Sequence, residues 1–171
     1  VQQQVKHLRE ILKYIHERGQ EKGGTPQIYY SVENNTLGEA ALIVINDIGE
    51  ENFHGLFLSE PIRKGHVRKF RKGFNTTNKS KITACNKFKI LVESGRMTIN
   101  SRPLVSELKT FVAMGTSYAA KPGETDDLVM ASLLAVRMLL LLQTYHSDLD
   151  THLKDHGDMI VEPFPFISMM R

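Results

Sequence analysis

The sequence predicts a mixed α/β domain, and three observations support that class. Helical and extended patterns alternate along the chain, without internal repeats or low-complexity segments. The 171 residues are 41% hydrophobic, which is enough to bury a core of ordinary size. The single cysteine, Cys85, excludes an internal disulfide framework and a four-cysteine zinc site. We therefore expect a mixed central sheet with helices on both of its faces.

The first predicted elements are a helix, a strand and a second helix. Residues 1–18 place apolar side chains at helical spacing and charged side chains opposite them, as in an amphipathic helix. Residues 27–32 are largely β-branched and aromatic, which is typical of a buried strand, and Glu33 closes that strand. The second helix extends to Ile48 and begins after one of three possible caps, Asn34, Asn35 or Thr36.

The middle of the chain alternates between extended and helical patterns. Residues 56–58 favour a short strand, and residues 61–78, which are basic and turn-rich, favour a mobile surface loop. A helix is expected from Lys79 to a stop at Gly95, followed by a brief strand at residues 97–99.

The last predicted elements are a helix, a strand and a long helix. Residues 101–112 form a helix opened by serine and proline, and residues 116–120 form a strand. A turn at residues 121–124 then leads into a helix over residues 125–145. The apolar stretch of this helix is interrupted by Arg137 and is shorter than the ~20 residues that cross a bilayer. We expect a buried core helix and no membrane partner.

Acidic side chains stand at the end of the first predicted strand and at the start of the last helix. Glu33 closes the strand, and Asp126 and Asp127 follow the turn at Gly123. In α/β sheets ligands gather beyond the carboxyl ends of the strands, so we expect these acids to meet. Carboxylates delivered to one place from two elements hold divalent metals against a phosphodiester, which indicates a nuclease.

Each acid taken singly has a plainer interpretation. Asp126 and Asp127 would complement the positive end of a helix dipole, with Thr125 as the N-cap. Glu33 would be a solvent-facing strand end or the partner of a nearby lysine. The nuclease interpretation depends on the two acidic positions being taken together.

Positive charge is concentrated between Pro61 and Val92, where the sequence has no Asp or Glu. Such a segment attracts the phosphates of nucleic acids, although a solvated basic loop is the plain alternative. The candidate contacts to DNA are Arg68, Lys69, Arg71, Lys72, Lys79 and Lys81.

Several segments together resemble one protein family. Residues 29–38 resemble the strand that carries the second catalytic acid in the terminase large subunits of tailed bacteriophages. Residues 104–111, 115–120 and 123–131 resemble, in the same order, the end of the nuclease domain in myovirus-type terminases. The resemblance covers residues 1–142, and its most specific element is the Asp-Asp-Leu-Val-Met sequence with its preceding strand and helix.

The resemblance implies an RNase H-like nuclease domain in residues 1–147, followed by a C-terminal tail, residues 148–171. Its activity would be metal-dependent endonucleolytic cutting of concatemeric phage DNA at the initiation and termination of packaging, with two Mg²⁺ or Mn²⁺ ions. Glu33 would be the second acid of the metal site and Asp127 the third, with Asp126 as an adjacent support or alternative ligand.

The family also implies partners and a location. These are double-stranded DNA, the portal protein, the terminase small subunit and an upstream ATPase domain, in the cytoplasm of the infected bacterial host on the prohead. Residues 1–171 contain no Gly-x-x-x-x-Gly-Lys-Ser/Thr phosphate loop, so ATP hydrolysis is not assigned to them.

The family's first metal-binding Asp lies on an N-terminal strand, ahead of the helix that opens this sequence. No Asp precedes Asp47 here, so we expect that strand to be missing from this segment. The metal site would then be incomplete and this fragment inactive on its own.

Two other functions remain open from the sequence. One is a non-catalytic DNA-binding or portal- and capsid-docking module, which would use the RNase H-like fold and its basic face without cutting. The other is a different RNase H-like nuclease, such as a resolvase.

Overall fold

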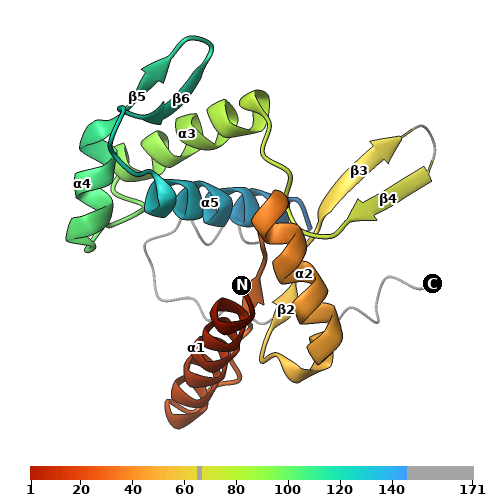
Figure 1. Cartoon of the computed structure of the whole chain (residues 1–171). Helices are drawn as coiled ribbons and strands as arrows, with labels where there is room; N and C mark the ends of the chain where they lie inside the picture. The colour runs from red at the N-terminus through yellow and green to blue at the C-terminus, as the bar shows by residue number, and fades with distance from the viewer. Residues whose placement is uncertain (65–66, 146–171) are drawn as a thin grey trace.

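Helices alternate with short strands in this computed structural model, which describes residues 1–64 and 67–145, with the backbone alone for residues 62–64 and 67–71 (Figure 1). The helices are α1 (Gln2–Glu21), α2 (Thr36–Ile48), α3 (Asn78–Glu93), α4 (Arg102–Thr110), α5 (Asp127–Tyr145) and a short 3₁₀ helix, Glu50–Asn52. The strands are β1 (Tyr29–Tyr30), β2 (Leu56–Phe57), β3 (Glu60–Lys64), β4 (Val67–Arg71), β5 (Phe111–Met114) and β6 (Ser117–Ala120). The mixed α/β class is confirmed. The predicted tail, residues 148–171, lies outside the described residues.

The strands pair two by two. β1 pairs in parallel with β2, while β3 with β4 and β5 with β6 form antiparallel hairpins. An isolated parallel bridge joins Glu33 to Phe74. The described ranges therefore hold three separate ladders in place of the single central sheet that we expected. The β3–β4 hairpin follows β2 in the chain, and at its base Glu60 N donates to Gly73 O (3.0 Å). This bond brings Phe74 close to the end of β2. Residues 28–34 therefore pair first with residues 56–58 and then with Phe74.

The basic segment contains a hairpin where we predicted a mobile surface loop, so that prediction was wrong. β3 and β4 pair in register from Glu60 with Arg71 to Lys64 with Val67. Ile62, Val67 and Phe70 are residue types that favour extended backbone, and pairing satisfies peptide groups that a loop would leave to water. β4 is therefore part of a two-stranded arm that projects from the body of the molecule (Figure 1).

The short strand predicted at residues 97–99 is absent from the described chain. Met97 N donates to Leu91 O (3.0 Å), at the end of α3, instead of to a partner strand. Met97 and Ile99 pack against the core as irregular chain. The helix predicted over residues 101–112 ends at Thr110, because Phe111 begins β5.

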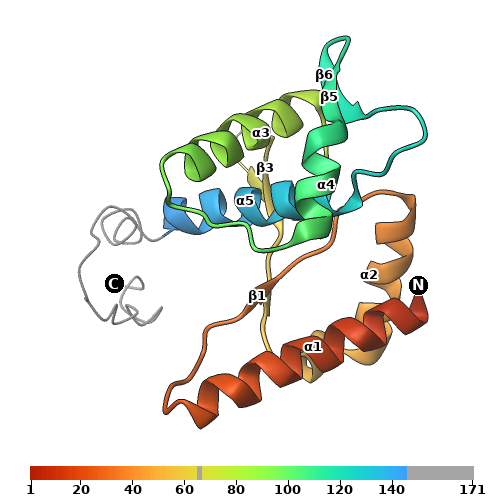
Figure 2. The same ribbon diagram turned by 90° about the vertical axis from the view of Figure 1, so that its left-hand side faces the viewer.

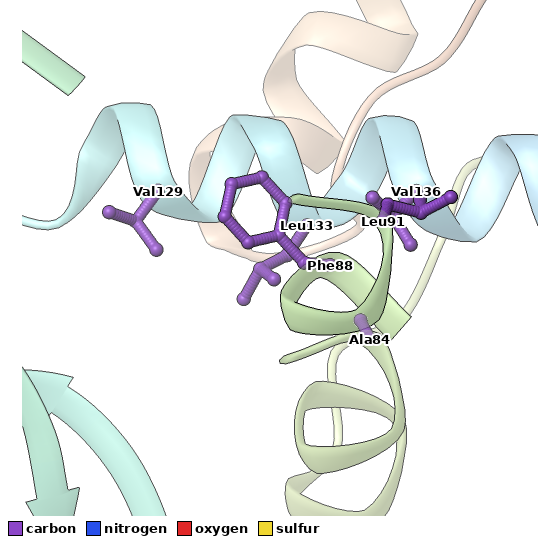
Figure 3. Packing of buried hydrophobic residues seen from close by; sticks show 6 residues of the cluster. All are labelled: Ala84, Phe88, Leu91, Val129, Leu133 and Val136. Carbon is purple, nitrogen blue, oxygen red and sulfur yellow. The ribbon is translucent and has the colours of Figure 1, made fainter. Parts of the chain in front are cut away.

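The helices α3, α4 and α5 enclose one hydrophobic cluster. Its buried members come from α3 and α5, and Figure 3 shows the two sets of side chains facing one another: Ala84, Phe88, Leu91, Val129, Leu133 and Val136. Leu104 and Leu108 of α4 pack against them. The part of the chain that the structure describes contains no helix that is both long and apolar enough to cross a membrane.

A second cluster joins α1 and α2 to β1 and β2. Its buried members are Val5, Leu12, Tyr30, Ile45 and Phe53. Figure 2 shows α1 and α2 on one side of the molecule and α3, α4 and α5 on the other, with the segment that carries β1 running between them. The end of this segment therefore lies where the two groups of helices approach each other.

Candidate functional site

One pocket of about 440 Å³ is lined by all three predicted acids. Glu33 comes from the end of the β1 segment, and Asp126 and Asp127 come from the start of α5. The polar residues Thr76, Lys81 and Arg137 line the same pocket, together with an apolar wall of Ala84, Met130, Ala131, Leu133 and Leu134. The structure thus brings together acids that are far apart in the sequence, beside two cations.

Glu33 is held by backbone hydrogen bonds on both sides of it. Phe74 N donates to Val32 O (3.0 Å), and Asn34 N donates to Phe74 O (2.7 Å), which forms the parallel bridge. The side chain is half-buried, and Asn35 Nδ2 donates to Glu33 Oε2 (3.2 Å). The backbone of this acid is therefore fixed by pairing, while its Oε1 accepts no hydrogen bond from the described residues and the residue lines the pocket.

Two glycines let neighbouring chain segments pass close to Glu33. A Cβ atom on Gly38, in the first turn of α2, would overlap the carbonyl oxygen of Glu33. Gly73 has φ 73°, in the left-handed region that favours glycine, and a Cβ there would meet the carbonyl oxygen of Val32. Asn35 caps α2 by accepting a hydrogen bond from Gly38 N (2.9 Å). The cap predicted at residues 34–36 is therefore Asn35.

The start of α5 is capped by a carboxylate from another helix. Glu107 Oε2 accepts hydrogen bonds from the backbone amides of Leu128 (2.8 Å) and Val129 (3.1 Å). Glu107 Oε1 accepts from the Thr125 hydroxyl (3.1 Å). The N-cap role predicted for Thr125 is thus taken by Glu107 of α4, because its carboxylate reaches the free amides at the helix start.

This cap leaves the acidic doublet free for another partner. Asp126 is half-buried and Asp127 is exposed. Within the described residues, neither carboxylate takes part in a hydrogen bond or an ion pair. Glu107 takes the capping part of the plain interpretation, which assigned the cap to Thr125. Asp127 still stands in the first turn of α5, where its charge complements the helix dipole.

Lys81, one of the predicted DNA-binding residues, lines the same pocket as the acids. Its Nζ donates to the carbonyl oxygen of Tyr118 on β6 (3.1 Å) and lies 5.9 Å from the centre of the Phe111 ring on β5. A cation is therefore held beside the acids by contacts with the β5–β6 hairpin.

The other predicted DNA contacts are distributed over neighbouring elements. Lys79 lies in the first turn of α3 and lines an adjacent pocket of about 430 Å³. Lys72 contacts both the 3₁₀ helix and α2, since its Nζ lies 2.6 Å from Glu50 Oε1 and donates to Asn46 Oδ1 (3.5 Å). The remaining three, Arg68, Lys69 and Arg71, lie on β4.

Two residues of the site were not predicted from the sequence. Glu107 and Arg137 lie on α4 and α5 and contact partners that are 21 and 77 residues away along the chain. The available signal for Arg137 was a single cation within an apolar helix, at a spacing that places it on the same face as Asp126.

The acids are not arranged as a preformed metal cluster. Among residues 1–64 and 67–145, no three His, Cys, Asp or Glu side chains form a group that could hold a metal ion. The sequence matches no protein-family model.

Proposed function

We propose that this chain is the RNase H-like nuclease domain of a phage terminase large subunit, acting as a metal-dependent DNA endonuclease. The observation that carries the proposal is the convergence of Glu33, Asp126 and Asp127 on one pocket beside Lys81. Nothing in local structure requires a strand end and a helix start so far apart in sequence to share a pocket. The resemblance of residues 29–38, 104–111, 115–120 and 123–131 to the family supports the same assignment.

The donor set fits Mg²⁺ or Mn²⁺. The pocket acids offer carboxylate oxygens, the ligands that these hard cations prefer. Mg²⁺ keeps several of its waters and needs only a few carboxylates, and a pocket of about 440 Å³ has room for hydrated ions. Two such ions, when bound, would activate a water and stabilise the leaving oxygen of an in-line displacement at phosphorus.

The residues of the site would have different roles, according to their chemistry. Glu33 and Asp127 would hold the metal, and Asp126 would support them or serve as an alternative ligand. Lys81 would place positive charge next to the phosphate that is cut. The cations of β4 and α3 would contact the duplex backbone, which positions DNA without reading its sequence.

The cellular role follows from the same resemblance. The domain would cut concatemeric phage DNA when packaging begins and ends, in the host cytoplasm on the prohead. It would work with an upstream ATPase domain, the terminase small subunit and the portal protein.

Cleavage of supercoiled plasmid in Mn²⁺ tests the assignment. The variants Glu33→Gln and Asp127→Asn should lose at least about 100-fold in rate, as expected when a group acting at the reacting centre is removed. Their affinity for DNA in Ca²⁺ should stay within about twofold of the parent, since phosphate contacts carry that affinity. Glu124→Gln, an exposed acid in the same turn, is the matched control and should cut normally.

The assay also runs on a chain extended through the N-terminal strand that the resemblance implies, so that a missing first acid does not conceal the activity. Cutting at the parental rate by either acidic variant rejects the roles assigned to Glu33 and Asp127.

A non-catalytic DNA-binding module is the second candidate. It is favoured by the ten lysines and arginines that lie between Pro61 and Val92, where no acid occurs. This second hypothesis predicts salt-dependent binding to duplex DNA. It also predicts that neither the 171-residue chain nor the N-terminally extended chain cuts DNA.

A further inference from the structure

Arg137 is a buried cation that connects α5 to a distant part of the chain. Its side chain is 9% exposed, and its Nη2 donates to Glu60 Oε1 (2.9 Å) and to the carbonyl oxygen of Asn75 (2.8 Å). Its Nη1 donates to the Thr76 hydroxyl (3.3 Å). One guanidinium therefore contacts three residues near the base of the β3–β4 hairpin.

The segment that Arg137 contacts is the one that pairs with Glu33. The guanidinium lies 5.1 Å from the centre of the Phe74 ring, and Phe74 forms the parallel bridge with Glu33. Glu60 also accepts a hydrogen bond from Asn75 N through its Oε2 (3.2 Å), which closes the arrangement around residues 74–76. The contacts thus lead from Arg137 through Phe74 to the acid.

The same helix carries the other acids. Asp126, Met130, Leu133 and Arg137 follow one another at intervals of four, three and four residues and all line the pocket. The acid and the arginine are separated by about 16 Å along a helix that rises 1.5 Å per residue. α5 therefore fixes the distance between the acidic doublet and Arg137. Arg137 in turn contacts the segment that pairs with Glu33.

Among the described residues, buried hydrophobic side chains form two separate clusters, one of α3 and α5 and one of α1, α2, β1 and β2. A buried charge is costly unless every donor is paired, so such a network tolerates one arrangement and disfavours others. Hydrophobic contacts alone would tolerate small shifts between the two groups.

Arg137 is not available to bind a phosphate. Glu60 balances its charge, and both of its terminal nitrogens are engaged in the contacts above. Lys81, by contrast, donates to the carbonyl oxygen of Tyr118 and has no acidic partner among the described residues. No carboxylate of those residues therefore balances its positive charge in an ion pair. The two cations of the pocket therefore have different roles.

We propose that Arg137 is a positioning residue that sets the placement of Glu33 relative to Asp126 and Asp127, and thereby the affinity of the pocket for divalent metal. The inference rests on the proposed function and deepens it. Arg137 acts through Phe74 and Glu60 and does not touch metal or DNA.

Mn²⁺ binding to the free protein, measured by calorimetry, separates this role from general stability. Arg137→Met should weaken Mn²⁺ binding at least about 10-fold at a temperature where the variant is folded, and should raise the Mn²⁺ concentration for half-maximal cutting in parallel. Arg137→Lys keeps the charge but not the planar fork, so it should recover part of the affinity. Arg102→Met, which removes an exposed arginine on α4, is the matched control and should leave Mn²⁺ binding unchanged.

Glu60→Gln keeps the arginine and removes its ionic partner, and it provides a second test if Arg137→Met fails to fold. A three- to fivefold loss of Mn²⁺ affinity in this variant supports the proposal. Parental Mn²⁺ affinity in a folded Arg137→Met or Glu60→Gln protein overturns it, even where the parent cuts DNA. Weakened binding in these variants without any cutting by the parent upholds the positioning role and rejects the nuclease assignment instead.

Discussion

The carboxylate of Glu107 accepts a hydrogen bond from the backbone amide of Leu128 at 2.8 Å, and so joins α4 to the first turn of α5. This contact fixes the point at which α5 begins. Asp126 and Asp127 stand at that point, so a residue of α4 determines where the acidic doublet enters the pocket.

Replacing Glu107 with Gln should therefore destabilise the protein and slow cutting. A charge-assisted cap is exchanged for a neutral one, at an expected loss of about 1–2 kcal/mol in the free energy of unfolding. Thermal melting should show a decrease of about 2–8 °C. The control is Glu93→Gln, an exposed acid paired with Lys89 at 3.7 Å, which should change the melting temperature little. Equal melting of the two variants would contradict the capping role.

Gly38→Ala tests the close approach of α2 to Glu33. Alanine usually stabilises a helix relative to glycine by up to about 1 kcal/mol. Here the added Cβ would overlap the Glu33 carbonyl oxygen, so we expect a loss of about 2–3 kcal/mol instead, measured by urea denaturation. Gly24→Ala meets no atom closer than 3.9 Å and should be nearly neutral. A stabilised Gly38→Ala protein would show that the approach is not required.

Cys85 should react slowly with iodoacetamide. Burial raises the pKa of its thiol, and the positive charge of Lys81 opposes that rise in part. Less thiolate is present at pH 8 than in a free cysteine, and the thiolate is the reactive form. Lys81→Met should slow alkylation further by moving the inflection of the rate to higher pH, whereas Lys109→Met should not. Faster alkylation in Lys81→Met would show that the lysine does not act on the thiol.

Tyr30 should make the stability of the protein fall in alkaline solution. Burial, and secondly the charge of Glu50, raise the pKa of this phenol to about 12. The unfolded chain loses the proton near pH 10 while the folded chain keeps it, so stability is retained below pH 10 and falls between pH 10 and 12.

The variant Tyr30→Phe removes the titrating group and should lose this part of the pH dependence. It also removes a buried hydroxyl for which the described residues supply no hydrogen-bond partner. Tyr14→Phe, at an exposed position, should keep the parental profile in urea denaturation at pH 9 to 12. If the parent, Tyr30→Phe and Tyr14→Phe show the same dependence of stability on pH, Tyr30 is not the group responsible for the alkaline loss of stability.

Local patterns predicted most of the helices. The amphipathic spacing of residues 1–18 appears as α1, the cap and apolar face around residues 35–48 appear as α2, and residues 125–145 appear as α5. These features depend on neighbours within one or two turns, so the sequence displays them directly. The prediction of a brief strand at residues 97–99 was wrong, because a strand forms only where another segment of the chain pairs with it.

The sequence by itself determined which residues could form the site: an acid at a strand end, an acidic doublet at a helix start and a basic segment between them. Tertiary structure alone decided that Glu107 caps α5, through an amide 21 residues away. It also decided that Arg137 contacts Thr76 and Asn75, 61 and 62 residues away, in the segment that pairs with Glu33. A buried charge is stable only where other groups supply its hydrogen bonds. Here those groups are distant in the sequence and become neighbours only when the chain has folded.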